Sequence, residues 1–230
     1  MRTKILKILQ SKKEEEYKDF SLKLLPKETK LLGVRIPIIK TLSKIIIKDN
    51  QIQEYLNISL DELVYQEEKM LYSLLIANSR LDDNQRLLKI KQYIPYIKNW
   101  SECDTFCSSL KCIKENKGVY YKAFKEYQKS KSEYEIRFFY VIALNYFIDE
   151  EFLPRILKHI KNQNYYGFYD KMAVAWFLSV AYTKYPSKIE EYLKTTKLEK
   201  FIFQKTISKI CDSLKVTKEA KAKIRAIASR

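Results

Sequence analysis

Glycine and proline are scarce in this chain, and that scarcity narrows what it can fold into. The 230 residues include three glycines and five prolines. A protein made of β-sheets needs turn residues about every 8–12 positions, and this sequence does not supply them. Apolar residues recur instead at spacings of three and four, as in Met70, Leu71, Leu74 and Leu75. The sequence therefore predicts an all-α protein.

The same periodicity places a series of helices joined by short polar connections. We expect them near residues 3–24, 37–48, 50–57, 60–78, 83–97, 100–115, 119–129, 133–147, 150–162, 168–184, 187–194, 198–213 and 217–228. The one distinctive linker runs from Leu25-Pro26 to Ile36-Pro37 and contains Gly33. Four Ser-x-x-Glu pairs have the pattern of a capping box at a helix start, namely Ser11/Glu14, Ser59/Glu62, Ser132/Glu135 and Ser187/Glu190.

Many helices of 10–18 residues with brief connections favour stacked antiparallel pairs that repeat about every 35–45 residues. We therefore expect a right-handed helical-hairpin solenoid of HEAT-like or ARM-type repeats, with an irregular helical bundle as the alternative. Residues 1–230 are expected to form a single domain and a monomer. A solenoid of this kind has a concave face, where a partner would bind.

The chain is strongly basic, with a formal charge of +16 from 44 Lys+Arg and 28 Asp+Glu. A field of that size attracts polyanions such as nucleic acid. However, only eight of the basic residues are arginine, and the chain also has 18 tyrosines. This composition is equally typical of an AT-rich genome, whose codon bias raises lysine without any nucleic-acid function. Charge alone leaves the partner open.

Membrane insertion and metal binding are not expected. No stretch approaches the roughly 18 uncharged apolar residues of a membrane helix, and the N-terminus has no signal-peptide pattern. A cytoplasmic protein is the expectation. Cys103, Cys107, Cys112 and Cys211, with the lone His159, lack the two close ligand pairs of a zinc site. We interpret the cysteines as core thiols and His159 as a helix-surface or packing residue, and we expect no metal and no cofactor.

Common catalytic motifs are also absent, including the P-loop, G-x-G-x-x-G, H-E-x-x-H and G-x-S-x-G. Any chemistry must therefore rest on carboxylates, aromatic rings and arginine. The segment Asn99-Trp100-Ser101-Glu102-Cys103-Asp104 allows two interpretations. If Asn99 caps a helix, Trp100 and Asp104 lie one turn apart on one face. If Ser101 is the cap, Asp104 merely completes a capping box.

Arg137 and Trp176 are two further candidate site residues. Arg137 comes just before the apolar run that starts at Phe138, in a chain with few arginines. Trp176 lies within Lys171-Met172-Ala173-Val174-Ala175-Trp176, where it is either an ordinary core residue or part of a site.

Together, these segments resemble the HEAT-like-repeat alkylpurine DNA glycosylases, the AlkD-like DNA alkylation-repair enzymes. Leu32-Gly33-Val34-Arg35-Ile36-Pro37 is similar to their early L-G-V-R-x-P signature, and Asn99 to Asp104 is similar to their N-W-D-x-x-D segment. Arg137 stands where the family has its active-site arginine. Lys171 to Trp176 is similar to their K-A-[IV]-x-W helix. The resemblance runs from about residue 15 to the C-terminus, in the family's order and spacing.

The resemblance implies a single HEAT-like-repeat DNA alkylation-repair domain over residues 1–230 that excises alkylated purines from duplex DNA without flipping the base. It implies catalytic roles for Asp104, Trp100 and Trp176, and phosphate contacts for Arg137, Arg35 and Lys171. Three positions depart from the family pattern: Ser101 replaces an acidic residue, and Phe138 and Ser179 each replace an arginine. A DNA-binding relative without catalysis and a protein-binding helical scaffold are therefore kept as alternatives.

Overall fold

The computed structural model describes residues 1–49 and 51–228, and it contains no strand within them. The α-helices of these residues are α1 (Arg2–Gln10), α2 (Glu15–Leu22), α3 (Ile36–Lys48), α4 (Ile52–Leu56), α5 (Gln66–Asn78), α6 (Asp83–Tyr93), α7 (Trp100–Ser109), α8 (Lys117–Phe124), α9 (Glu133–Tyr146), α10 (Leu153–Ile160), α11 (Phe168–Lys184), α12 (Pro186–Thr195), α13 (Lys200–Asp212) and α14 (Lys218–Ala228). Short 3₁₀ helices are η1 (Leu60–Glu62), η2 (Ile94–Tyr96), η3 (Lys111–Lys114) and η4 (Lys125–Lys129). The all-α prediction is confirmed.

The predicted helix over 3–24 is wrong, because the chain breaks between α1 and α2. Ser11 ends α1, and its hydroxyl donates to the Ile8 carbonyl instead of capping the next helix. The other three capping boxes are also wrong. Ser59 and Ser132 precede helices without a side-chain cap bond, and Ser187 lies inside α12. Residue 50, where another helix was expected to begin, lies outside the described residues.

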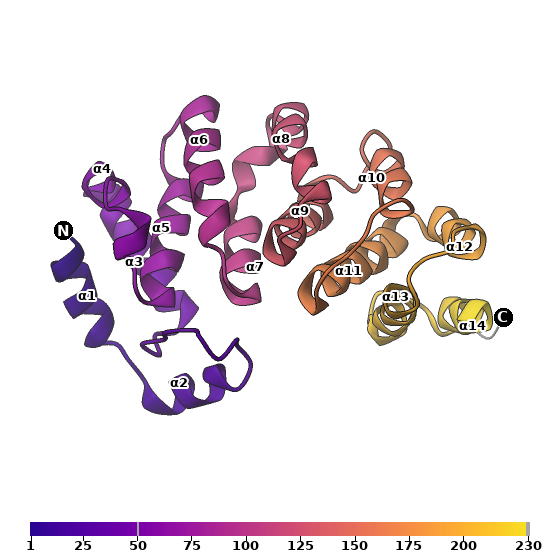
Figure 1. The fold of residues 1–230 in the computed structure, drawn as a ribbon, viewed down its shortest axis with the longest axis horizontal. Helices are drawn as coiled ribbons and strands as arrows, with labels where there is room; N and C mark the ends of the chain where they lie inside the picture. The colour runs from indigo at the N-terminus through magenta and orange to yellow at the C-terminus, as the bar shows by residue number, and fades with distance from the viewer. Residues whose placement is uncertain (50, 229–230) are drawn as a thin grey trace. The chain divides into compact units, whose positions relative to one another are not determined.

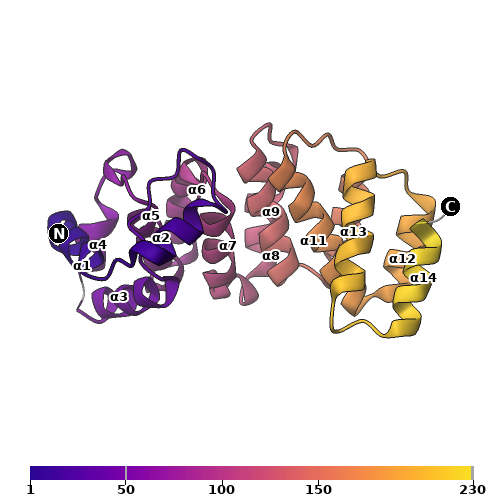
Figure 2. The ribbon, with the colours of Figure 1, turned by 90° about the horizontal axis from the view of Figure 1, so that it is seen from below.

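The chain divides into two compact units, Met1–Ile113 and Lys114–Arg230. In the first, α3, α5 and α7 pack in chain order with α5 in the middle, while α4 and α6 pack on α5 (Figure 1). In the second, α9, α11 and α13 pack in chain order, and α12 and α14 flank α11 and α13 (Figure 2). Each unit thus has the repeated packing of a helical solenoid. The single domain expected over 1–230 stays a prediction.

Each unit has an aromatic core. In the first unit the rings of Tyr55, Tyr72, Tyr93 and Phe106 follow one another with centroids 5.1–6.3 Å apart. These separations and the tilted or edge-on geometry of most pairs are typical of favourable aromatic contacts. These rings pack α4, α5, α6 and α7 against one another and thereby position the helices that carry the candidate site.

In the second unit, α9 and α11 are apolar on nearly all sides. Every side chain of α9 from residue 136 to residue 143 is buried. A helix of this composition requires neighbours around it, and α11, η4 and the other helices supply them. Within residues 1–49 and 51–228, no helix combines the length and apolar character required to cross a membrane.

Candidate active site

Helix α7 begins at Trp100 because Asn99 caps it. The Asn99 side-chain oxygen accepts a hydrogen bond from the Glu102 backbone N–H at 3.0 Å. Of the two interpretations left open by the sequence, capping by Asn99 is confirmed and capping by Ser101 is wrong. Trp100 and Asp104 are therefore four residues apart within one helix, on the same face.

Two buried polar groups fix the start of α7 on the neighbouring helix. The Asn99 amide donates to Gln66 Oε1 at 2.8 Å, which joins α7 to the first residue of α5. Glu102 accepts from the Lys98 backbone N–H at 3.1 Å. Since Glu102 is only 2% exposed, burial raises the pKa of its carboxyl group to about 7. These contacts hold the turn that carries Trp100 and Asp104.

The raised pKa predicts a pH effect on stability that the Glu102→Gln variant should lack. A folded-state pKa above the usual 4.5 means that the neutral carboxyl stabilises the fold fully below pH 4.5. This stabilisation is lost as the pH rises through 7. Between pH 4.5 and 8, the free energy of unfolding of the wild type should therefore fall by about 3 kcal/mol more than that of Glu102→Gln. Urea unfolding of both proteins at the two pH values tests this, and parallel pH profiles would contradict it.

Trp100 and Asp104 line one largely apolar cavity of about 180 Å³. Its walls include Tyr17 and Phe20 from α2 and Met70 from α5. The Trp100 indole N–H donates to the Leu24 carbonyl at 2.9 Å, which fixes the plane of the ring at the cavity edge. Both side chains are half-buried, so each is partly accessible to solvent. The structure thus places an indole and a carboxyl group against the same space.

A buried carboxylate that was not among the predicted site residues holds the segment that supplies Leu31 and Val34 to the cavity. Glu67 accepts hydrogen bonds of 2.7–3.1 Å from the backbone N–H groups of Leu32, Gly33 and Val34. Gly33 has φ +96°, and a Cβ there would lie 2.7 Å from the Glu14 carbonyl oxygen. These contacts give the Leu-Gly-Val part of the signature a structural role, because they fix the linker between α2 and α3, which in the structure begins after α2 and includes Leu24.

Arg35, the next residue of that signature, forms an ion pair. Its guanidinium contacts Glu14 at 2.9–3.0 Å and lies 4.8 Å from the centre of the Tyr17 ring. The Arg35 side chain is 54% exposed. The phosphate contact expected for Arg35 stays a prediction, and it would compete with Glu14.

Arg137 and Lys171 both lie beside the start of α11 in the second unit. Arg137 donates to the Tyr169 carbonyl at 3.1 Å and is 6% exposed. Lys171 pairs with Glu199 at 2.9 Å. The same helix start is fixed by Asp170, which accepts from the Tyr166 and Gly167 backbone N–H groups. Both expected phosphate ligands thus have protein partners here, and their DNA contacts stay predictions.

Trp176 lies in α11 and is half-buried. It lines a cavity of about 370 Å³ together with Ser179, Asp212 and Lys215. The Lys209 ammonium group lies 6.0 Å from the centre of the indole ring, within the range of a cation–π contact. Its catalytic role is not tested by this geometry.

The four cysteines and the histidine differ in their burial. Cys103 and Cys107 are buried free thiols, as expected for core residues, while Cys112 and Cys211 are half-buried. His159 is half-buried in α10, and burial lowers the pKa of its imidazole. No group of three or more potential metal ligands occurs among the residues that the structure describes.

A scan against protein-family models matched residues 5–210 to the family described as DNA alkylation repair enzyme. The chain belongs to this family. The match covers most of each compact unit and includes every candidate site residue, from Arg35 to Trp176. The resemblance drawn from the sequence motifs is confirmed at the level of the family. Neither the search of curated proteins nor the search of solved structures gave a match.

The three departures from the pattern of these alkylation-repair enzymes have different surroundings. Ser101 lines the cavity beside Trp100 and Asp104. Phe138 is fully buried and packs edge-on against Phe124 at 5.2 Å, so it is a core residue here. The Ser179 hydroxyl donates to the Trp176 carbonyl at 2.8 Å. Only Ser101 therefore changes the chemistry of the Trp100 cavity.

Proposed function

We propose that this DNA alkylation repair enzyme is a DNA glycosylase that removes positively charged N3- and N7-alkylated purines from duplex DNA. The observation that carries the proposal is the shared cavity of Trp100 and Asp104. Membership of the family supports a role in repair of alkylated DNA. A cytoplasmic location and a monomeric state stay predictions.

The chemistry needs little from the protein, because alkylation at N3 or N7 already gives the purine a positive charge. When the glycosidic bond breaks, its electron pair goes to the base, which leaves as a neutral molecule. The deoxyribose then develops oxocarbenium character, and water adds to its anomeric carbon and releases a proton. Asp104 is proposed to stabilise the sugar cation and to orient that water.

The aromatic and basic residues are given supporting roles. Trp100 and Trp176 are proposed to contact the lesion and its sugar, since an indole face attracts developing positive charge. Arg137, Arg35 and Lys171 are proposed to hold phosphates of the DNA backbone. For the two arginines and the lysine, DNA would have to share or replace the present partners, which are the Tyr169 carbonyl, Glu14 and Glu199.

This mechanism predicts which lesions are released. The proposed site has one carboxylate and no histidine among its residues, so no general acid protonates a departing base. Uracil, hypoxanthine and 1,N6-ethenoadenine are neutral and would have to leave as anions. Duplex oligonucleotides with 3-methyladenine or 7-methylguanine should therefore yield abasic sites, whereas matched duplexes with the neutral lesions should not. Efficient release of uracil would overturn the proposed chemistry. DNA binding without release of any base would instead support a non-catalytic role.

A further inference from the structure

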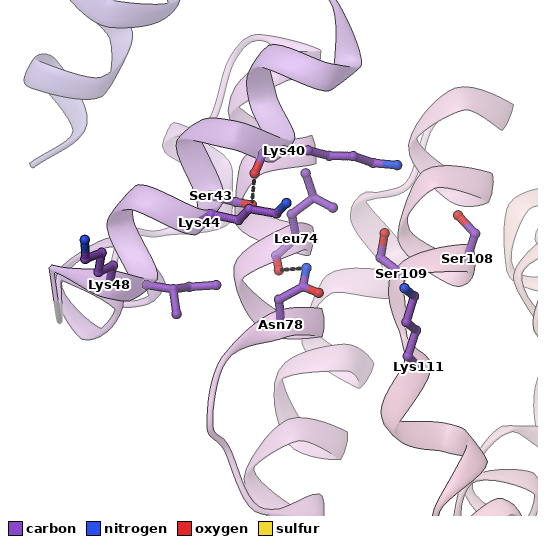
Figure 3. Close-up of a pocket in the computed structure, with 10 residues that line it drawn as sticks. Lys40, Ser43, Lys44, Lys48, Leu74, Asn78, Ser108, Ser109 and Lys111 are labelled. Carbon is purple, nitrogen blue, oxygen red and sulfur yellow. Dashed lines mark hydrogen bonds between the residues drawn. The ribbon is translucent and has the colours of Figure 1, made fainter.

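A second hollow of the first unit is lined by lysines. Lys40, Lys44 and Lys48 lie four residues apart on α3, which places them on one face in steps of about 6 Å. The groove has a volume of about 470 Å³. Figure 3 shows Lys40 and Lys44 extending from α3 toward α7, with Lys111 on the opposite side beside Ser109. We call this the lysine groove.

The lining of the lysine groove is cationic and polar. Its other lining residues are the serines at 43, 108 and 109, Asn78 and two aliphatic side chains, and it contains no carboxylate. Some lysines elsewhere in the chain pair with acids, as Lys117 does with Asp149 at 2.7 Å. By contrast, none of the four groove ammonium groups forms an ion pair within residues 1–49 and 51–228. Three exposed lysines on one face of α3, with Lys111 on the other side and no carboxylate in the lining, concentrate positive charge along the groove.

The groove continues the Trp100 cavity along the same three helices. The first halves of α3, α5 and α7 supply Ile36, Met70 and Asp104 to the cavity. Residues further along the same helices line the groove, among them Lys40, Lys44 and Lys48 of α3, Leu74 of α5 and Ser108 of α7. Because each helix lines the cavity with earlier residues and the groove with later ones, the three helices run in the same direction. Ser108 follows Asp104 by one turn on the same face of α7.

We propose that the lysine groove binds the sugar–phosphate backbone of duplex DNA next to the nucleotide at Asp104. The assignment to duplex DNA rests on the proposed function. The reasons are the row of unpaired ammonium groups, the hydroxyl and amide groups between them and the position one helical turn from the carboxylate. Such a site neutralises phosphates and releases their counterions without reading base sequence. It would set the register of the strand relative to the catalytic residue.

Binding to an undamaged duplex tests the groove without involving base release. The test variant carries Lys40→Gln, Lys44→Gln and Lys48→Gln, and the control carries Lys4→Gln, Lys7→Gln and Lys12→Gln. Both sets remove three exposed lysines from the first unit, so the charge change is equal. Fluorescence anisotropy against salt gives affinity and slope, and melting temperatures confirm that the variants fold.

We expect the groove variant to bind roughly 10- to 100-fold more weakly at low salt, and its log–log salt slope to be shallower by about 2.7, or about 0.9 for each lost phosphate contact. Lys111→Gln alone should reduce the slope by about 0.9. The control variant should change the slope by less than about 0.9, the value for one phosphate contact. Equal losses in both triple variants, an unchanged groove variant, or a loss confined to single-stranded DNA would overturn the proposal. If the groove variants bind DNA as expected but the wild-type protein releases no base, only the proposed glycosylase function is overturned.

Discussion

Replacing Asp104 with asparagine should lower the single-turnover rate of methylpurine release by roughly 10²–10³-fold, the range for removal of one preorganised electrostatic group. Asparagine keeps the size of the side chain and removes the negative charge that is proposed to stabilise the sugar cation. Asp104 is half-buried at a cavity wall and is not the cap of α7. The melting temperature and the affinity for undamaged duplex should therefore stay close to wild type.

A matched control is available in the same unit. Asp82 caps α6 by accepting from the Gln85 N–H at 2.9 Å, and asparagine is an equally good cap. Asp82→Asn should therefore change neither stability nor base release. If Asp104→Asn behaved like this control and released methylpurine at the parent rate, Asp104 would have no catalytic role.

Glu67→Ala is expected to have the largest effect on stability, with a loss of more than about 3 kcal/mol in the free energy of unfolding. The substitution leaves the backbone N–H groups of Leu32, Gly33 and Val34 buried without their carboxylate acceptor. Glu67→Gln keeps one oxygen at the same place and should lose less. Urea unfolding of the three proteins provides the comparison.

The same variant tests whether the linker positions the cavity. The linker carries the Leu24 carbonyl that holds the Trp100 indole, so Glu67→Ala should also change the tryptophan fluorescence of the folded protein. Wild-type stability in Glu67→Ala would show that the Leu-Gly-Val signature has another purpose.

The sequence predicted those features that depend on local pattern. The spacing of Met70, Leu71, Leu74 and Leu75 predicted a helix that ends with α5 at residue 78, although its expected start at residue 60 is six residues too early. The helix expected from residue 100 begins there as α7, and of the two caps left open by the sequence Asn99 is the one used. The predicted capping boxes were wrong where a side chain hydrogen-bonds to another group instead of to the helix start. Ser11 donates to a carbonyl of the preceding helix, and Glu135 accepts from the Ser130 hydroxyl instead of from a helix start.

Most of the site depends on partners far apart in the sequence. Glu67 binds backbone groups 33–35 residues away, and Asn99 binds Gln66 across 33 residues. No local pattern contains such pairs. One signal was present, however. A linker with Gly33 between two helices must satisfy its buried N–H groups, and the acidic start of α5 offers an acceptor. The lysine groove could not be predicted for a different reason: among 36 lysines (44 basic residues less eight arginines), nothing local marks the four that line it.

Chromatography of the bases released from methylated duplex DNA tests the central claim most directly. Duplex DNA treated with a methylating agent would be incubated with the wild-type protein, and the soluble fraction would be separated from the polymer over a time course. The glycosylase proposed here should release free 3-methyladenine and 7-methylguanine and leave unmodified bases in the DNA. Release no faster than in the enzyme-free control, by a folded protein that binds the duplex, would contradict it.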